Sequence, residues 1–297
     1  MQNVSGTPLI ANLPHITRHA CPLVMERTHD VTIVKSGAVK TWIFACALLA
    51  ILNTPAEATP VEVRLKEGVT QGYLSVSVPG GARIAEGEVS QVATGADRLV
   101  SRMVLRFNDG SRHNETAIFS QQKFFKLIRY SVDQQGPSFP QDLHFDLDAG
   151  TGAYTIREGP ASKENSPRTG TLELPPDVYN GMTVMVLKNL PESKQAAFHI
   201  LSVDQEPTLY PVVVRAVDVD AVKTGNRKSE AVHYVLQPTL KWLTRALAWM
   251  FSKTIPEYHF WLITQDVPAF MKFEGPLYPG GPIWRLEQIS PRLATTP

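Results

Sequence analysis

The stretch AVHYVLQPTLKWLTRALAWMFSKTIPEYHFWLITQDVPAFMKFEGPLYPGGPIWRLEQI, residues 231–289, decides the fold. Residues 231–237 alternate apolar and polar side chains, which is typical of a strand. Residues 238–253 carry apolar side chains at helical spacing, between Pro238 in the first turn and Pro256 beyond the end. Three further alternating runs follow, and the last is GGPIWRLEQI. This order predicts a helix set among antiparallel strands.

The predicted helix 238–253 has an unusually wide apolar arc of roughly 200° on a helical wheel. Lys241 and Arg245 lie on the narrow opposite stripe. We predict that this helix lies across the open side of a curved sheet. A lid over a lipophilic cavity and a helix lying in a membrane interface are the alternatives. The candidate ligand-contacting residues are Trp242, Leu243, Leu247 and Met250 of the arc, together with Phe260 of the next strand.

Residues 1–58 are predicted to be an N-terminal extension followed by a secretory signal peptide. Lys35 and Lys40 precede an apolar core over residues 41–52, and Ala56-Glu57-Ala58 supplies an A-x-A cleavage site. An uncleaved anchor or a buried core helix is the alternative interpretation. We expect cleavage near Ala58, export, and a location in the periplasm or the outer envelope of a bacterium.

Both cysteines, Cys21 and Cys46, precede the expected cleavage site. The mature chain 59–297 would therefore contain no disulfide, thiolate metal site or cysteine nucleophile. The whole chain has a net charge of +1, and removal of the leader leaves equal numbers of acidic and basic residues. This balance gives no electrostatic basis for a nucleic-acid partner. The remaining length is ample for one β-rich domain over residues 59–297.

Most of the mature chain consists of short alternating runs separated by turn signals, which predicts a mainly β protein with an antiparallel sheet. One example is RLVSRMVLRF, which ends at the hairpin turn Asn108-Asp109-Gly110. The pattern changes in LELPPDVYNGMTVMVLKNLP, which predicts a short strand and a second helix near residues 176–190, with Asp177 in its first turn. Gly181 weakens the helix prediction, and a buried strand over residues 183–187 is the alternative.

The segments LHFDLDAGTGAYTIR (143–157), LPPDVYNGMTVMVLKNLP (174–191) and VPAFMKFEGPLYPGGPIWRLEQI (267–289) carry a resemblance. Together they resemble exported bacterial families of unknown function that are similar in fold to the periplasmic lipoprotein-localisation carriers. The resemblance implies a strongly curved antiparallel sheet, a half-barrel or open barrel, with one or two helices packed on its concave side. It also implies a lipophilic interior.

The best polar cluster in the sequence is Asp142, His144, Asp146 and Asp148. At strand spacing these side chains share one face, while the apolar residues between them point to the other face. Histidine and carboxylates two residues apart could hold a divalent cation or form an acid–base pair, and His144 and Asp146 are the candidate metal ligands. A solvated strand face has the same pattern. We favour that interpretation and predict no metal site.

Two histidines, His233 and His259, lie on the strands that flank the predicted helix 238–253 and could meet across the sheet. A hydrogen-bonded structural role is the favoured interpretation. Asp218 and Asp220 repeat the acidic strand pattern in a weaker form. The sequence contains neither a G-x-S-x-G elbow nor an H-E-x-x-H motif, and no glycine-rich turn precedes a helix as phosphate binding requires. We therefore predict no catalytic residue and no cofactor.

These observations predict an exported, non-enzymatic binding or carrier protein for a lipophilic small molecule, a lipid or an envelope component. One alternative is a hydrolase that uses the strand face of residues 142–148. Another is a structural protein that docks to a partner in the envelope. Peripheral membrane contact through residues 238–253 is expected if that helix lies in a membrane interface.

Overall fold

The computed structural model describes residues 60–159, 166–191, 195–204, 206–224, 227–239, 256–265 and 267–290, all within one compact unit, Thr54–Pro297. Residues 240–253 of the first predicted helix, with Trp242, Leu243, Leu247 and Met250, lie outside the described residues, as does the predicted leader. Pro238 was predicted to begin that helix. It is instead the last residue of strand β11 (Arg227–Pro238), where it pairs with Val212.

Within the described residues, fourteen strands form a single antiparallel sheet in the order β8-β7-β6-β5-β4-β3-β2-β1-β14-β13-β12-β11-β10-β9. The first and last strands of the chain pair with each other at its centre, and the edges are β8 and β9. The bounds of the other strands are β1 (Thr70–Ser77), β2 (Arg83–Ala93), β3 (Arg98–Phe107), β4 (Arg112–Gln121), β5 (Phe125–Gln135), β6 (Leu143–Asp148), β7 (Ala153–Glu158), β8 (Arg168–Thr171), β9 (Ala196–Ser202), β10 (Thr208–Thr224), β12 (Tyr258–Ile263), β13 (Ala269–Gly275) and β14 (Trp284–Ile289).

Most strands form where the alternation of side chains predicts them, but β8 ends at Thr171, before the short strand expected at the start of residues 172–191. In β6, Leu143, Phe145 and Leu147 are buried, while the polar residues between them are partly exposed. One face of each strand therefore contributes to the interior, and the other faces solvent.

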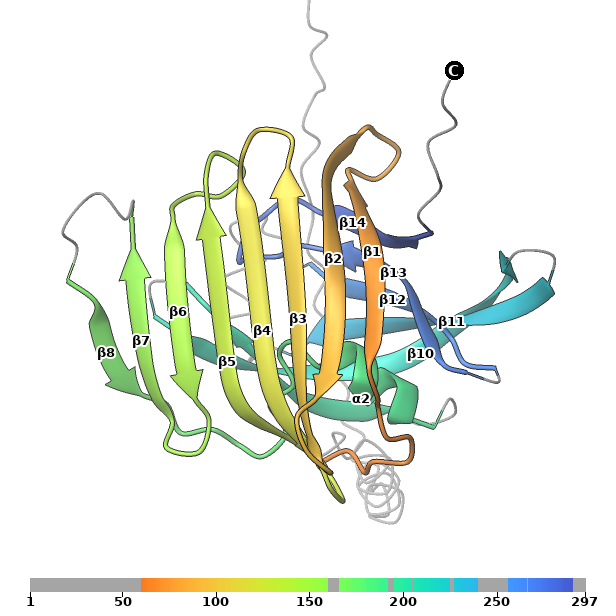
Figure 1. Cartoon of the computed structure of the whole chain (residues 1–297), viewed down its shortest axis with the longest axis horizontal. Helices are drawn as coiled ribbons and strands as arrows, with labels where there is room; N and C mark the ends of the chain where they lie inside the picture. Colours follow the sequence, from red (N-terminus) through yellow and green to blue (C-terminus); the bar gives the residue numbers. More distant parts are fainter. Residues whose placement is uncertain are drawn as a thin grey trace, which may run out of the picture. The chain divides into compact units, whose positions relative to one another are not determined.

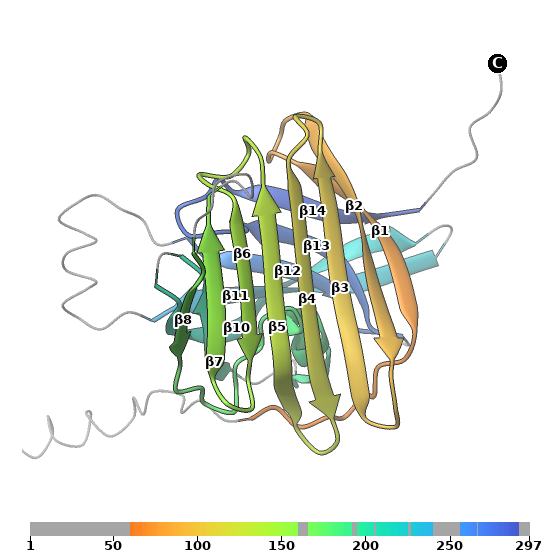
Figure 2. The same cartoon turned by 60° about the vertical axis from the view of Figure 1, so that its left-hand side comes forward.

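The sheet curves so that its two halves face each other. Figures 1 and 2 show strands β3–β7 crossing strands β10–β13, with the helix α2 (Thr183–Asn189) between the two layers. The main core takes buried apolar side chains from both layers and from the helix, including Phe119, Phe145, Leu187, Phe198 and Leu262. The predicted curved, mainly β sheet with a helix on its concave side is confirmed. The sheet remains open because β8 and β9 do not pair.

A second core lies beside the main core, and its buried members come from β1–β3, β13, β14 and the loop after β5. They are Leu74, Val76, Ala85, Leu105, Phe107, Phe139, Phe273, Trp284 and Leu286. Phe139 is the centre of an aromatic group, because its ring contacts those of Phe107, Tyr278 and Trp284 at centroid distances of 5.5–6.0 Å.

The helix α2 is shorter than the predicted helix near residues 176–190, and the alternative of a strand over 183–187 is wrong. Gly181 has a φ of +67°. A right-handed α-helix needs a negative φ, so no helix can run through this residue. Before it, Val178 forms a bridge with His199 of β9. The carboxylate of Asp177, predicted in a first helical turn, instead lies 3.0 Å from His199 Nδ1. In the described part of the chain, no helix has the length and apolar character needed to span a membrane.

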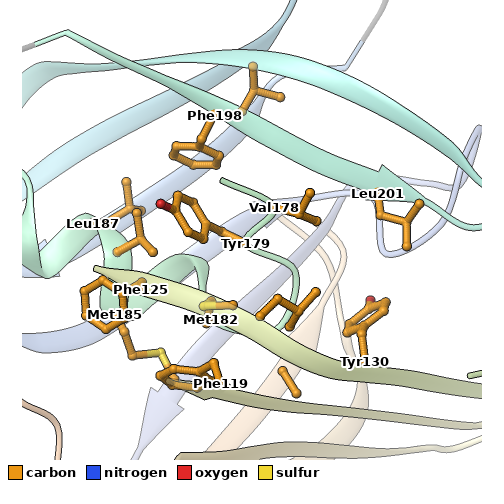
Figure 3. Close-up of a cluster of buried hydrophobic side chains, with 14 of the residues drawn as sticks. Phe119, Phe125, Tyr130, Val178, Tyr179, Met182, Met185, Leu187, Phe198 and Leu201 are labelled. Atoms are coloured by element: carbon orange, nitrogen blue, oxygen red, sulfur yellow. The ribbon is translucent and has the colours of Figure 1, made fainter. Parts of the chain in front are cut away.

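The segment before α2 is fixed in the main core by Tyr179, which is fully buried. Its ring packs edge to face on Phe198 at 5.2 Å, and its hydroxyl accepts a hydrogen bond of 2.8 Å from the backbone N–H of Val61. Figure 3 shows Tyr179, Met182 and Leu187 between strand β9, which carries Phe198, and strands β4 and β5, which carry Phe119 and Phe125. This chain segment therefore joins the two layers.

Candidate binding site on the concave face

The polar cluster on β6 lies on the outer face of the sheet, opposite the main core. The ring of His144 lies between two carboxylates, with Nδ1 2.7 Å from Asp133 and Nε2 2.7 Å from Asp146. Partial burial lowers the pKa of His144, but the hydrogen bonds and charges of both carboxylates outweigh this effect and raise it above its ordinary value. Both ring nitrogens are thus occupied. Among the described residues, no group of three or more His, Cys, Asp or Glu side chains is arranged to hold a metal ion.

The other two carboxylates of this cluster stabilise turns. Asp142 accepts a hydrogen bond from the backbone N–H of Gly136, and Asp148 accepts bonds from those of Gly150 and Thr151. The hydrogen bond from the Thr151 N–H is the main reason that the pKa of Asp148 is lowered. Asp142, His144, Asp146 and Asp148 therefore do not converge on a common point.

A second outer-face cluster lies on β10–β13, where His233 and His259 meet, with Nε2 of one 3.0 Å from Nδ1 of the other. Trp261, which the sequence analysis did not single out, stacks on His233 at 4.1 Å, and its indole N–H donates to Asp220 at 2.9 Å. Lys272 Nζ lies 3.6 Å from the centre of the same indole ring. Burial, and then the neighbouring His259, lower the pKa of His233. Nε2 of His233 and Nδ1 of His259 thus occupy each other, and Nε2 of His259 lies 3.9 Å from the carboxylate of Glu257.

The concave face carries a polar track that the sequence analysis also missed, formed by Gln91 of β2, Ser101 of β3, Glu115 of β4 and Tyr130 of β5. Gln91 pairs directly with Ser101, and Ser101 pairs with Ala117, two residues from Glu115. Tyr130 also pairs with Ala117. Since alternate residues share a face, all four side chains point the same way as the buried Ala117 and hence into the concave side.

Glu115 lies between the two cores. On its own strand its inward neighbours are Ala117 of the main core and His113, whose ring stacks on Phe139 of the second core at 6.2 Å. The hydroxyl of Tyr130 donates a hydrogen bond of 2.8 Å to Glu115 Oε1. Burial raises the pKa of Glu115, and the bond from Tyr130 only partly offsets this effect. Burial, and then the charge of Glu115, raise the pKa of Tyr130 well above its usual range.

Apolar side chains beside the polar track are only partly buried, although they face inward. Met103 pairs with Glu115 on one side and with Val89 on the other. Phe260, a predicted ligand-contacting residue, packs against both cores, and Phe270 packs against the second core. A closed core would bury such residues fully. The concave face therefore presents accessible apolar surface next to a carboxyl group.

The polar track can be recognised in the sequence once the inward phase of each strand is known. Glu115 occupies the same phase as Ala117 and Phe119 in the run ETAIFS, and Ser101 occupies the phase of Leu99 in RLVS. The signal is a polar residue at an apolar position of an alternating run. The sequence analysis selected the outer-face clusters as candidate sites because histidine and aspartate are common in catalytic and metal sites.

At the second-core end of this site, His113 is buried and uncharged. Gln134 Nε2 donates to its Nδ1 at 3.1 Å, and burial lowers the pKa of His113 to about 4. The unfolded chain therefore binds more protons than the folded protein between pH 4 and pH 6.5. We expect this residue to lower the free energy of unfolding by about 3 kcal/mol as the pH falls through that window.

Substitution of His113 tests this expectation by chemical denaturation at a series of pH values. His113→Asn keeps an acceptor for Gln134 but does not titrate, so the decline toward pH 4 should become shallower. His144→Asn is the matched control. The raised pKa of His144 gives stability that is fully present below pH 6.5 and is lost as the pH rises through the folded-state pKa, so its loss should change the pH dependence above pH 6.5 and leave the slope between pH 6.5 and pH 4 unchanged. An unchanged pH dependence in His113→Asn would contradict the assignment.

Comparisons with known proteins add a likeness of fold but no family. Neither a protein-family model nor a curated protein matches the sequence. Among solved structures, the chain is similar to a beta-barrel-like protein of a domain of unknown function, DUF1849, from Brucella abortus. The identity is 9%, the match covers 80% of this chain and 98% of that chain, and the TM-score is 0.39.

Proposed function

We propose that this protein is a non-enzymatic binding protein that holds a lipophilic ligand on the concave face of its curved sheet. The observation that carries the proposal is the partial exposure of Val89, Met103, Phe260 and Phe270, which face inward beside the cores. Accessible apolar surface on an inward face is costly in water, and an apolar ligand would remove that cost. Export to the bacterial envelope, expected from the leader, is part of the proposal.

The outer-face clusters support a binding role over a hydrolase. A general base needs a nitrogen or oxygen that is free to accept a proton from substrate. The ring of His144 is engaged by Asp133 and Asp146 on both sides, and the rings of His233 and His259 are engaged with each other. The hydrolase alternative at residues 142–148 therefore lacks a free nitrogen on His144, whereas His233 and His259 each keep one nitrogen outside their mutual contact.

The proposal predicts that the protein binds the neutral apolar fluorophore N-phenyl-naphthylamine, with an increase in its emission. Met103→Glu introduces a charge into the apolar part of the site and should raise the Kd by about tenfold or more, a loss of at least about 1.4 kcal/mol. Fluorescence titration measures both values. Lipid extraction of protein purified from its native compartment, followed by native mass spectrometry, identifies what is bound there.

The neighbouring Arg102→Glu is the control, because Arg102 lies on the same strand but is exposed on the outer face. It should leave the Kd unchanged. Thermal unfolding checks that both variants fold, and Met103→Ala replaces Met103→Glu if the latter does not. Absence of probe binding by the unsubstituted protein, or equal effects of the two charge substitutions, would refute the proposed function.

A further inference from the structure

The polar end of the ligand can be inferred from the chemistry of the polar track, an inference that rests on the proposed function. We propose that the ligand is an amphiphile whose polar end donates hydrogen bonds, a long-chain amine or alcohol, with Glu115 and Gln91 as its acceptors. The apolar chain of such a ligand would lie along Val89, Met103 and Phe260.

One acceptor on the concave face lacks a hydrogen-bond donor, and a second has no charged partner among the described residues. Gln91 is 6% exposed, and its side-chain oxygen is buried without a hydrogen-bond partner among the described residues. Glu115 receives one hydrogen bond, from Tyr130, and no charged group of the described residues contributes to its pKa. A buried acceptor without a donor is destabilising, and so is a partly buried carboxylate without a cation beside it. A donor group of the ligand would remove that penalty.

The side-chain amides near the track are already used as hydrogen-bond donors. Asn180, the loop residue before α2, donates from Nδ2 to the carbonyl of Leu201 at 2.7 Å and accepts from the Leu201 N–H at 2.7 Å. Gln134 donates to His113. Among the described residues, Glu115 therefore has Tyr130 as its hydrogen-bond donor, while Nε2 of His113, the preceding inward residue of β4, is buried without a partner.

The charge of Glu115 also selects against anionic ligands. A carboxylate or phosphate head beside a half-buried carboxylate would be repelled or would have to take up a proton. An ammonium head would form a charge-assisted hydrogen bond, which is roughly twice as strong as a neutral one. The expected order of affinity is therefore amine, then alcohol, then uncharged ester, with the carboxylate weakest.

The order is tested with dodecylamine, dodecanol, methyl dodecanoate and dodecanoate, which share one chain length and differ only at the polar end. Each amphiphile is tested for displacement of N-phenyl-naphthylamine at concentrations below the critical micelle concentration of that amphiphile. Isothermal titration calorimetry gives the Kd. Dodecylamine should bind at least about tenfold more tightly than dodecanoate, a difference of about 1.4 kcal/mol.

The variant Glu115→Gln removes the charge but keeps the shape and an oxygen that accepts from Tyr130. It should raise the Kd of dodecylamine by about tenfold and leave the Kd of methyl dodecanoate unchanged. The ratio between the Kd values of dodecanoate and dodecylamine should become smaller. The control Glu86→Gln makes the same chemical change on the exposed outer face of β2 and should alter none of these values.

The outcomes separate this inference from the proposed function. If none of the four amphiphiles displaces the fluorophore, the proposed function fails. If all four bind equally well to the unsubstituted protein, the concave face is a binding site but the inference about the polar end is wrong. Tighter binding of dodecanoate than of dodecylamine would also overturn it, and this comparison does not depend on whether Glu115→Gln folds.

Discussion

Leu187→Asp is expected to prevent folding, and Leu187→Ala is expected to lower the free energy of unfolding by about 2–5 kcal/mol. Leu187 is fully buried in α2. Its neighbours in the main core come from both layers of the sheet, so a defect there weakens the contact between the layers. An aspartate at this position would be an unpaired charge away from water, which no described neighbour could compensate. Circular dichroism and urea denaturation measure both effects.

Two control variants distinguish the effect of burial at residue 187 from the effect of introducing an aspartate anywhere in the chain. Leu187→Met nearly conserves the volume and should cost less than about 1.5 kcal/mol. Val69→Asp introduces the same carboxylate at a residue that is 74% exposed, and it should change the free energy of unfolding by no more than about 0.5 kcal/mol. A cooperative, native-like unfolding transition for Leu187→Asp would show that α2 does not hold the layers together.

Gly181→Ala should lower the free energy of unfolding by about 2–5 kcal/mol. Two effects add at this position. The φ of +67° is strained for any residue with a Cβ, at a cost of about 1–2 kcal/mol. The added Cβ would also lie 2.6 Å from the Cβ of Ala117, which cannot move without its strand, and overpacking of this kind costs about 1–3 kcal/mol.

Gly80→Ala isolates the first of these effects. Gly80 has a φ of +72°, close to that of Gly181, but an added Cβ there would meet no atom within 4 Å. It should therefore cost only about 1–2 kcal/mol, the backbone strain alone. Thermal or chemical denaturation of the two variants gives the difference. Equal losses would mean that the contact between residue 181 and β4 is not as tight as the structure has it.

The candidate residues show how far sequence reasoning reached. The alternation in LHFDLD correctly predicts that Phe145 and Leu147 face the core and that His144 does not. The possible meeting of His233 and His259 also follows from strand spacing, and the two rings are 3.0 Å apart at their nearest nitrogens. Neither pattern could indicate Trp261 as the ring between His233, Asp220 and Lys272, because that stack depends on four strands and on their register.

The polar track was missed for a related reason. Gln91, Ser101, Glu115 and Tyr130 come from four strands, and none of them belongs to a recognisable motif. Each lies within a run that is mainly apolar on its inward side, and the inward side is known only when the sheet is assembled. Proximity of Glu115 to Tyr130 is set by the pairing of β4 with β5 and by the bulge after Ile118.

The sequence by itself determined that this is a mainly β protein with antiparallel strands and a helix near residue 185. Alternation with a period of two residues and turn residues at fixed offsets are local properties, so they can be read along the chain. The tertiary structure decided how the sheet curves, where α2 begins, and which polar side chains face the interior. Those outcomes depend on contacts between residues far apart in the sequence. One is the hydrogen bond from Val61 to Tyr179, and another is the approach of Gly181 to Ala117, and no local pattern specifies either.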